Sequence, residues 1–532
     1  MSQTASSPNP PASPQPAAAV RWTVLLGAAV LAALAVRALV VPLFVREMLS
    51  YPLDYFFNEG DTLFYTLRLM HGQPVYSNSS SLPLLGNIYP PVFLWICAAF
   101  GSIVPPTLAS GRAFALVPLV LTMTFCGLYL RRAKAGGAIV AGAVLLIPCC
   151  YSMSSFLIMP RCDAWMVAFC MGSLYFLAAP QATRRDLILG GIFSALALFT
   201  KQTALFGVFA VHATLLFQQP RKGLVAGLSA ALACALLLAV SLWEFGPVMI
   251  DALTMTSGRT FDATRFMRYY LPVLFALGPV AALALLRART NVANRRWDLL
   301  DSYVIGHGLQ SGLMLFVQSS SNYFLDVFPG LVVAAALLAD AWLKHYAAER
   351  AAAPTKYSIA AVVVALLVAA QLWVQLPFEN TVIPPNSFEQ AQAWIARKFL
   401  TESDQPVYSE HLWGVVADRP ATNLYFSEST HAATLKPGRL PAGTLEAPFR
   451  ERKFGRLMLF VGNAFHTPEV FEAITANYER VDQQEHFLKI CFGDADDLQV
   501  QFYVRKGDPI PALLGQASAS PPAAVPADER RQ

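Results

Sequence analysis

Long apolar runs separated by short polar loops dominate the first 376 residues of this chain. A run of about 20 apolar residues can cross roughly 30 Å of hydrocarbon as a helix. The pattern therefore predicts an all-α polytopic membrane protein with about 11–12 transmembrane helices. The eleven main runs lie at 22–44, 111–130, 138–157, 164–180, 186–200, 203–217, 222–243, 270–287, 299–318, 328–343 and 357–376.

A further short run, residues 89–104, is bounded by Pro90–Pro91 and Pro105–Pro106. Proline lacks the backbone N–H that a helix interior needs, so these pairs limit the length of any helix between them. We interpret this run as a segment that dips into the membrane and returns, or that lies at its surface.

The pattern changes near residue 377, where short alternating stretches replace the long apolar runs. Residues 387–400 have a helical period with Ser387 as the expected N-cap. Three stretches are typical of strands: 405–410, 456–462 and 498–507. We predict a transmembrane domain at 21–376, with a first outer loop at 45–90, and a small α/β domain at 377–510. The tails, 1–20 and 511–532, are rich in Ser, Pro and Ala and are expected to be disordered.

Composition supports the membrane assignment. The chain is 55% hydrophobic and 14% charged, with a mean hydropathy of +0.46, whereas soluble domains are about 25% charged. Seven of the eight cysteines fall in or beside apolar runs and none has a CxxC spacing, so neither disulfides nor a cysteine-bound metal is expected. The net charge of +5 is modest, and no nucleic-acid partner is expected.

Basic residues in the loops predict the orientation. Lys and Arg are retained on the cytoplasmic side during insertion. If 89–104 does not cross, fourteen basic residues between 131 and 356 share one side, and six between 112 and 268 lie on the other. We therefore expect a cytoplasmic N-terminus and a C-terminal domain outside. The outer loops would be 45–110, 158–163, 200–203, 244–269 and 318–327.

Three of these outer loops carry charged residues beside apolar segments. Glu59 and Asp61 lie in the first, Arg161 and Asp163 in the second, and Lys201 in a tight turn between two apolar runs. The simplest interpretation is a set of solvated acids, a surface ion pair and a lysine that snorkels to the interface. Ionisable groups at a membrane edge also mark sites, and an outer lysine suits a phosphate.

Two more outer segments are polar. Residues 257–270 contain Arg259, Arg265 and Arg268, and form either an amphipathic surface helix or a clamp for a lipid-linked phosphate. Residues 318–330 contain a run of hydroxyls with Asn322 and Tyr323, which is either an N-cap cluster or a set of hydrogen-bonding groups for a polar headgroup.

Several of these stretches together resemble the bacterial GT-C glycosyltransferases, which are relatives of the protein mannosyltransferases and the aminoarabinose lipid A transferases. The resemblance rests on the acids of the first outer loop and on LRLMHGQPVY, IYPPVFLWICAAFG, RCD, TKQT and NYFLD. It covers roughly residues 22–345. It implies a bacterial inner-membrane enzyme with an outward-facing cavity that transfers a sugar from a polyprenyl-phosphate donor to a lipid, glycan or protein acceptor.

The resemblance also implies roles for residues. A first-loop acid acts as the base of an inverting transfer or holds a divalent metal, which corresponds here to Glu59, with Asp61 as its neighbour. Relatives have Asp before the Glu, whereas this chain has Asn58, so the choice between Glu59 and Asp61 stays open, with Glu59 preferred. Asp163 is the second acid and, with Glu59, the candidate metal ligand. Arg161, Lys201, Arg259, Arg265 and Arg268 are expected at the donor phosphate, and Tyr89, Gln202, Asn322 and Tyr323 at the substrate.

Two other functions fit parts of the pattern. A transporter or flippase of a lipid-linked saccharide would also have charges at membrane depth, but the chain shows no inverted repeat or paired broken helices. A scaffolding protein acting through residues 377–510 is the second alternative. The four histidines of that domain, His411, His431, His466 and His486, are too widely spread to predict a metal cluster.

Overall fold

The computed structural model describes the membrane part almost continuously and the C-terminal part in pieces. The described residues are 17–55, 59–77, 85, 87–254, 261–316, 321–348, 354–409, 443–460, 467–481, 486–488 and 498–511. Most of the expected disordered tails, residues 1–16 and 512–532, lies outside them, as do Arg259 and the eighth cysteine, Cys491, whereas residues 17–20 of the expected N-terminal tail form the start of a helix.

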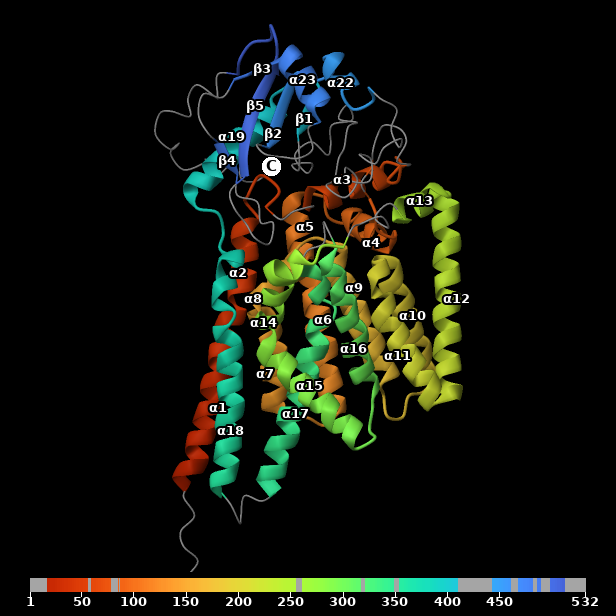
Figure 1. Cartoon of the computed structure of the whole chain (residues 1–532), viewed down its shortest axis with the longest axis vertical. Helices are drawn as coiled ribbons and strands as arrows, with labels where there is room; N and C mark the ends of the chain where they lie inside the picture. Colours follow the sequence, from red (N-terminus) through yellow and green to blue (C-terminus); the bar gives the residue numbers. More distant parts are fainter. Residues whose placement is uncertain are drawn as a thin grey trace, which may run out of the picture.

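Helices make up the membrane part (Figure 1). Their bounds are α1 (Ala17–Ala38), α2 (Val40–Met48), α3 (Glu59–Met70), α4 (Val92–Gly101), α5 (Leu108–Phe114), α6 (Leu116–Arg132), α7 (Gly137–Cys149), α8 (Tyr151–Ile158), α9 (Cys162–Leu177), α10 (Arg184–Thr200), α11 (Leu205–Gln218), α12 (Pro220–Phe245), α13 (Val248–Thr254), α14 (Leu271–Ala276), α15 (Gly278–Ala293), α16 (Leu299–Ser311), α17 (Phe328–Ala348) and α18 (Pro354–Trp373). Short irregular turns join some of them: η1 (Gln202–Ala204), η3 (Phe266–Tyr270), η4 (Gly312–Leu315), η5 (Ser321–Phe324) and η6 (Leu376–Val382).

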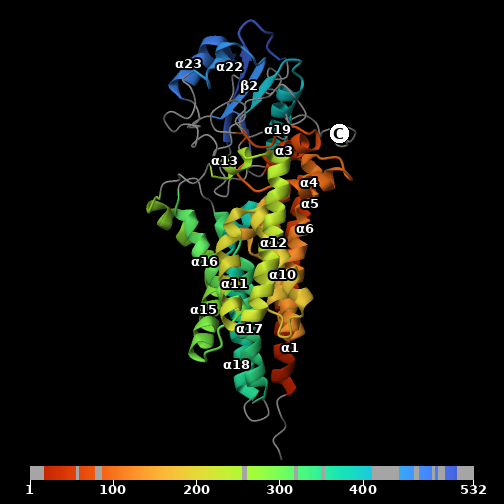
Figure 2. The same ribbon diagram turned by 90° about the vertical axis from the view of Figure 1, so that its right-hand side faces the viewer.

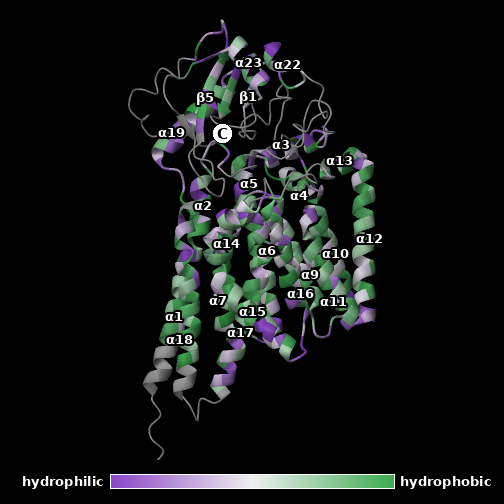
Figure 3. Cartoon of the chain, viewed as in Figure 1, coloured by the Kyte–Doolittle hydropathy of each residue, from purple (hydrophilic) through white to green (hydrophobic). Residues whose placement is uncertain are grey.

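Among the described residues, four stretches are long and apolar enough to span a membrane: Leu25–Met48, Leu108–Arg132, Pro220–Phe245 and Ser321–Ala347. Two bent helix pairs and four shorter apolar helices add to them. Apolar colour covers the flanks of these helices in Figure 3, and polar residues gather at their ends. The predicted multi-span, mostly helical membrane protein is confirmed.

Two runs that were expected to be straight are bent. The helices α7 and α8 meet at 76°, and the pair Phe266–Ala276 and Gly278–Ala293 meets at 75°. Proline stands at each break, Pro148 near the end of α7 and Pro279 at the start of α15. Because proline removes a helix hydrogen bond and clashes with the preceding turn, an apolar run can continue where its helix cannot.

The segment 89–104 forms only the ten-residue α4. At 1.5 Å per residue this helix is about 15 Å long, half of the hydrocarbon thickness. It packs against α3 and α10 and lies at the same end of the bundle as α3, α5 and α13 (Figures 1 and 2). We call this the domain end, because the C-terminal domain lies above it. The start of α1, the end of α17 and the start of α18 lie at the opposite end (Figure 1).

The C-terminal domain is a small mixed sheet with helices, as expected. Its strands are β1 (Val407–Ser409), β2 (Arg456–Phe460), β3 (Tyr478–Arg480), β4 (His486–Leu488) and β5 (Leu498–Arg505), in the order β1-β2-β5-β3 with β4 also pairing with β5. β1 and β2 are parallel, and the other pairs are antiparallel. Helices α19 (Ser387–Thr401), α22 (Ala447–Arg450) and α23 (Pro468–Asn477) complete it.

The N-cap of α19 differs from the expectation. Asn386, not Ser387, caps the helix: its side chain accepts from the Glu389 backbone N–H, and the Glu389 carboxylate accepts from the Asn386 backbone N–H. Asn is at least as good an N-cap as Ser, and the position three residues before Glu389 completes a reciprocal pair.

Candidate functional site

The helix α3 lies at the domain end and begins at Glu59. Glu59 and Asp61 both lie in the first turn of this helix, where carboxylates are favoured by the helix dipole. Two residues along a helix correspond to a rotation of about 200°, so the two side chains point to different surroundings. The closeness of Glu59 and Asp61 in the sequence therefore does not predict a shared role.

Glu59 is 1% exposed and forms a bidentate ion pair with the equally buried Arg112 of α5. Arg112 donates from Nε to Oε1 at 2.6 Å and from Nη2 to Oε2 at 2.9 Å. The Glu59 Oε2 atom also accepts from the Tyr55 backbone N–H at 3.0 Å. Both carboxylate oxygens of Glu59 are thus engaged by neighbouring groups of the protein.

Asp61 is in a different situation. It is partly buried, and burial raises the pKa of its carboxyl to about 7 from an ordinary 3.8, while the charge of Arg161 opposes that rise. A carboxyl with a pKa near 7 can gain or lose a proton under physiological conditions. Asp61 and Arg161 therefore belong to one electrostatic neighbourhood, although 100 residues separate them in the sequence.

Asp163, at the start of α9, is the centre of a buried polar cluster. It accepts from Lys201 Nζ at 2.5 Å and from the Asn322 amide at 2.7 Å, and Arg161 Nε lies 3.5 Å from its Oδ2 atom. Lys201 and Asp163 are 2% and 1% exposed. Breaks in the helices place these groups: Arg161 precedes α9, Lys201 separates α10 from η1, and Asn322 lies in η5.

Aromatic and amide groups surround this cluster. The Tyr89 hydroxyl accepts from Arg161 Nη2 at 3.3 Å, and Lys201 Nζ lies 4.9 Å from the centre of the Tyr323 ring. Gln202 reaches the same segment as Tyr89, because its amide donates to the Ile88 carbonyl at 3.0 Å. Seven residues expected at the site are therefore close together: Tyr89, Arg161, Asp163, Lys201, Gln202, Asn322 and Tyr323.

The arginines of the 257–270 segment are placed differently. Arg265 donates from Nε to the Met314 carbonyl at 3.1 Å and stacks on Tyr269, and the exposed Arg268 lies over the same ring. Their segment contacts the cluster's surroundings through Tyr270, whose ring centre is 4.8 Å from that of Phe324. Within the described residues, both guanidinium groups lie against the Tyr269 ring and not in the cluster around Asp163.

Two buried residues next to these clusters were not expected. Arg112 was expected only as an outer basic residue, and Asp326 was only part of the NYFLD stretch. Asp326 is fully buried, with its carboxylate accepting from Gln310 and its carbonyl from the Tyr303 hydroxyl at 2.8 Å. The sequence does not show whether a charged residue beside an apolar run is buried, because that depends on its binding partner. The partners of Arg112 and Asp326 lie in other helices.

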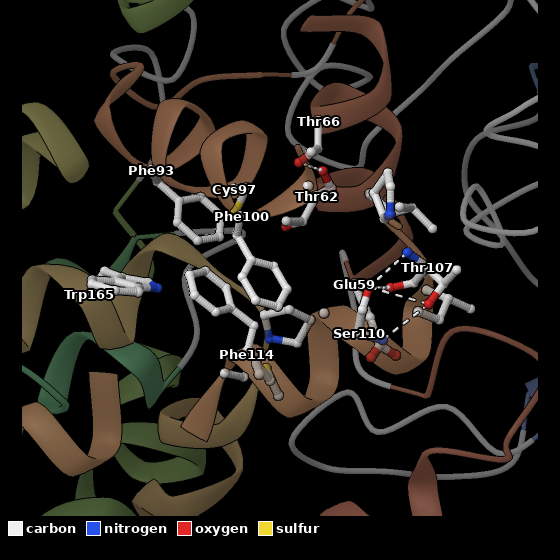
Figure 4. Close-up of a pocket in the computed structure, with 18 residues that line it drawn as sticks. Glu59, Thr62, Thr66, Phe93, Cys97, Phe100, Thr107, Ser110, Phe114 and Trp165 are labelled. Atoms are coloured by element: carbon white, nitrogen blue, oxygen red, sulfur yellow. Dashed lines mark hydrogen bonds between the residues drawn. The ribbon is translucent and has the colours of Figure 1, made fainter. Parts of the chain in front are cut away.

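A pocket adjoins Glu59 (Figure 4), whereas Asp61 is not among the residues that line it. It lies between α3, α4, α5 and the start of α9 and has an empty volume of about 520 Å³. Phe93, Phe100, Phe114 and Trp165 gather on one side, whereas Thr62, Thr66, Thr107 and Ser110 supply hydroxyls. Phe100 and Phe114 are stacked with ring centres 4.1 Å apart.

A larger hollow of about 1640 Å³ lies among α1, α7, α15, α17 and α18. Apart from Gln371 and Trp342, its lining side chains are aliphatic. The charged clusters do not line it, so it is not part of the candidate site.

The acids do not form a metal site in the described part of the chain. Glu59 is occupied by Arg112, and Asp163 by Lys201 and Asn322. Among those residues, no three His, Cys, Asp or Glu side chains gather closely enough to hold a metal ion. The side chains around Asp163 are cations and amides, which suit an anion better than a metal.

Comparison with known proteins supports the resemblance. Residues 89–244 match the family of dolichyl-phosphate-mannose-protein mannosyltransferases, and this segment contains Arg161, Asp163 and Lys201. No curated protein sequence matches the chain.

The fold is similar to that of solved structures. ArnT from Cupriavidus metallidurans bound to undecaprenyl phosphate is 13% identical, with 91% of this chain and 98% of ArnT covered and a TM-score of 0.51. Its apo form is 14% identical, with the same coverage and a TM-score of 0.50. The oligosaccharyltransferase AglB from Archaeoglobus fulgidus is 12% identical over 74% of this chain and 63% of AglB, with a TM-score of 0.44. The chain is therefore a multi-span membrane protein with an ArnT-like GT-C fold, and its segment 89–244 is similar in sequence to the protein mannosyltransferases.

Proposed function

We propose that the chain is a membrane glycosyltransferase that transfers a sugar from a polyprenyl-phosphate-linked donor to a lipid, glycan or protein acceptor at the domain end. The observation that carries this proposal is the buried cluster in which two cations, Arg161 and Lys201, lie against the carboxylate of Asp163. The family similarity of residues 89–244 and the GT-C fold support it.

The charges of the cluster suit the leaving group. With Asp163 ionised, Arg161 and Lys201 leave one positive charge in excess, and a polyprenyl-phosphate sugar is a phosphodiester with one negative charge. Cleavage of its sugar–oxygen bond adds negative charge to the phosphate. Fixed cations in a water-poor site stabilise that developing charge strongly. Arg161 and Lys201 would bind the donor phosphate, and Asp163 with Asn322 would hold Lys201 in place.

We propose Asp61, and not the preferred Glu59, as the base that accepts the proton of the incoming hydroxyl. Both oxygens of Glu59 accept hydrogen bonds from Arg112, and one also accepts from Tyr55. Asp61 has a pKa raised to about 7 and faces the field of Arg161. A base works best when its pKa is near the working pH, and such catalysis typically contributes about 10²–10⁴-fold. The acceptor hydroxyl would attack the anomeric carbon opposite the phosphate and invert its configuration.

The location of this reaction follows from the loop charges. We propose that the protein lies in a bacterial inner membrane with its domain end in the periplasm and its N-terminus in the cytoplasm. The basic pair Arg131–Arg132 and Lys344 lie at the opposite end of the bundle, where Lys344 donates to the Lys134 carbonyl at 2.6 Å. That is the arrangement expected from the positive-inside rule.

The test uses the purified full chain in lipid nanodiscs with a panel of labelled polyprenyl-phosphate hexoses and pentoses. We expect release of polyprenyl phosphate with at least one donor when crude envelope acceptors are added. Lys201→Ala should lower the rate about 100- to 1,000-fold, since it removes one charge at the leaving phosphate. Lys344→Ala, a lysine change at the opposite end, is the matched control and should leave the rate unchanged.

Two results would contradict the proposal. One is equal release by the wild type and Lys201→Ala at equal protein levels. The other is movement of a labelled polyprenyl-phosphate sugar across proteoliposomes with no release of polyprenyl phosphate, which is the behaviour of a flippase.

A further inference from the structure

The hollow among α1, α7, α15, α17 and α18 lies outside the proposed transfer site and has an empty volume of about 1640 Å³. Its five helices form a ring, because α1 packs against α7, α7 against α17, α17 against α15, α15 against α18, and α18 against α1. The side chains that line it are aliphatic except for Gln371 and Trp342. Close-packed protein interiors leave few voids larger than a water molecule. Because a buried water needs about two to four polar partners, these walls favour hydrocarbon over water.

Two glutamines close the hollow toward the domain end. Gln371, in the last turn of α18, is the lining residue of that helix nearest the domain end, and Gln375 follows the helix. Both side-chain amides donate to the Ala276 carbonyl, at 2.8 Å and 2.7 Å. The Gln371 side-chain oxygen accepts from the Val280 backbone N–H at 3.3 Å, and that of Gln375 accepts from the Ser152 backbone N–H at 2.9 Å.

These bonds satisfy backbone groups at the two bends of the bundle. Ala276 and Val280 flank the break between α14 and α15, and Ser152 follows the break between α7 and α8. Inside a bilayer such groups need protein partners, because water is not there to bind them. Gln371 and Gln375 are 1% and 0% exposed and join α18 to both breaks. The hollow therefore ends, on its domain side, at a buried polar layer whose amides are already bound.

The length of the hollow matches one leaflet of a membrane. On α17 its lining residues run from Val332 to Leu343, toward the opposite end of the bundle. This stretch of helix is about 16 Å long at 1.5 Å per residue. One leaflet contributes about half of the roughly 30 Å of hydrocarbon in a bilayer. A lipid chain of a single leaflet fits this length, whereas a chain that crosses the bilayer does not.

Aromatic and basic residues stand at the opposite end of the hollow. Trp342 lines it there, and tryptophan is typical of the boundary between membrane and water. The Lys344 side chain is 55% exposed, pairs with Asp340 at 2.7 Å and donates to the Lys134 carbonyl at 2.6 Å. Lys134 and Arg131 are exposed. These three cations and one carboxylate leave a positive balance beside the start of α7, which suits the phosphate of a lipid headgroup.

We propose that the hollow binds one acyl chain of an anionic phospholipid from the leaflet at the opposite end, with the lipid phosphate at Lys134 and Arg131. The polyprenyl chain of a sugar donor fits less well. Its phosphate would lie at the domain end, and its chain would have to pass the layer bound by Gln371 and Gln375. The inference does not depend on the proposed transfer reaction.

The test places the full chain in phosphatidylcholine nanodiscs with a minor share of a phosphatidylglycerol that carries a photoreactive diazirine near the end of one acyl chain. Labelled residues are read by mass spectrometry after illumination. Leu146 and Val332 line the hollow and are 7% and 2% exposed, so a lipid outside the bundle does not reach them. We expect both to be labelled, and the buried Val167 of α9, which does not line the hollow, to stay unlabelled. The exposed Leu236 of α12 reports labelling from the surrounding bilayer.

Filling the hollow should displace the chain. Ala335 and Ala339 lie one turn apart on α17, and both line the hollow. Ala335→Leu combined with Ala339→Leu should lower the labelling of Leu146 and Val332 about tenfold, because added side chains overpack an occupied site. Labelling of Leu236 should not change.

A second filling variant acts from another wall of the hollow. Gly142→Leu is used if the double variant does not fold, because a Cβ added at Gly142 meets only the Leu31 side chain, at 3.7 Å. Ala235→Leu, on the exposed face of α12, is the matched control and should keep the wild-type labelling. Lys134→Gln tests the headgroup: it should lower labelling by the phosphatidylglycerol probe about fivefold relative to a phosphatidylcholine probe with the same diazirine.

Four results would overturn the inference. The first is wild-type labelling of Leu146 and Val332 no higher than that of Val167, and the second is unchanged labelling in filling variants that insert correctly. The third is loss of this labelling when an equimolar amount of undecaprenyl phosphate is added, since a polyprenyl chain would then be the occupant. The fourth, an unchanged lipid preference in Lys134→Gln, would overturn the placement of the phosphate. Labelling needs no sugar donor, so a failure of the proposed transferase activity is recognised separately.

Discussion

Raising the pH from about 6 to 8 should increase kcat/KM for the donor about tenfold, because the base must be ionised to accept a proton. The perturbation acts on Asp61, whose pKa burial raises to about 7. At about pH 6 roughly 9% of such a group is ionised and at about pH 8 roughly 91%, which gives the factor of ten. An unperturbed carboxyl with a pKa of about 4 would be almost fully ionised throughout and would give a flat profile.

The assay is the initial rate of polyprenyl phosphate release at donor concentrations well below KM, because kcat/KM reports the free enzyme. The measurements run from about pH 5.5 to 8.5 at constant ionic strength. Asp61→Asn should lower the rate about 10²–10⁴-fold and leave a residual activity without the rise between pH 6 and 8. Glu59→Gln tests the competing assignment and should retain a rise with pH if it folds.

A flat profile in the wild type would refute the reasoning, since it would mean that no group with a pKa near 7 limits the reaction. An Asp61→Asn protein that keeps both the wild-type rate and the rise would refute it as well. In that case the proton would be accepted by another group.

Three further outcomes are expected. Replacing Asp163 by Asn should leave Arg161 and Lys201 without their carboxylate partner and lower the melting temperature of the protein in lipid. Added undecaprenyl phosphate should then raise the melting temperature of the variant by more than it raises that of the wild type. A lower melting temperature without this larger increase would contradict an anion site at the cluster. Arg112→Met should destabilise the protein by about 3–5 kcal/mol, because it leaves the buried Glu59 charge unpaired; chemical denaturation with a loss below about 1 kcal/mol would show that Glu59 finds another partner. Asn386→Ala should cost the C-terminal domain about 1 kcal/mol by removing the N-cap of α19, with Ser387→Ala as the matched control that costs less; equal losses would mean that Asn386 is not the working cap.

Local sequence patterns predicted the helices and strands of the fold, because each element buries apolar residues that lie close together in the sequence. The apolar runs, the change of pattern near residue 377 and the three strand segments could all be found without the structure. The two sharp bends escaped detection, since Pro148 and Pro279 lie inside stretches whose hydrophobicity continues across the break. Proline position carries that signal better than mean hydropathy does.

The sequence predicted which residues belong to the candidate site, but not which of their side chains bind each other. A polar residue at the end of an apolar run can be recognised from its neighbours in the sequence, and six such residues do meet around a seventh, Asp163. The choice between Glu59 and Asp61 could not be made this way, because their difference lies in what each one faces. Arg112 looked like any loop arginine until its pairing with Glu59 was known.

The sequence by itself determined that this protein spans a membrane repeatedly, that it carries a small C-terminal α/β domain, and that its polar residues gather at helix ends. Tertiary structure alone decided which charges neutralise each other: Glu59 pairs with Arg112 across 53 residues, and Asp163 binds Lys201 across 38 and Asn322 across 159. The physical reason is that burial depends on residues near in the sequence, whereas the protonation and availability of a buried acid depend on partners that only the packing of distant helices brings within hydrogen-bond distance.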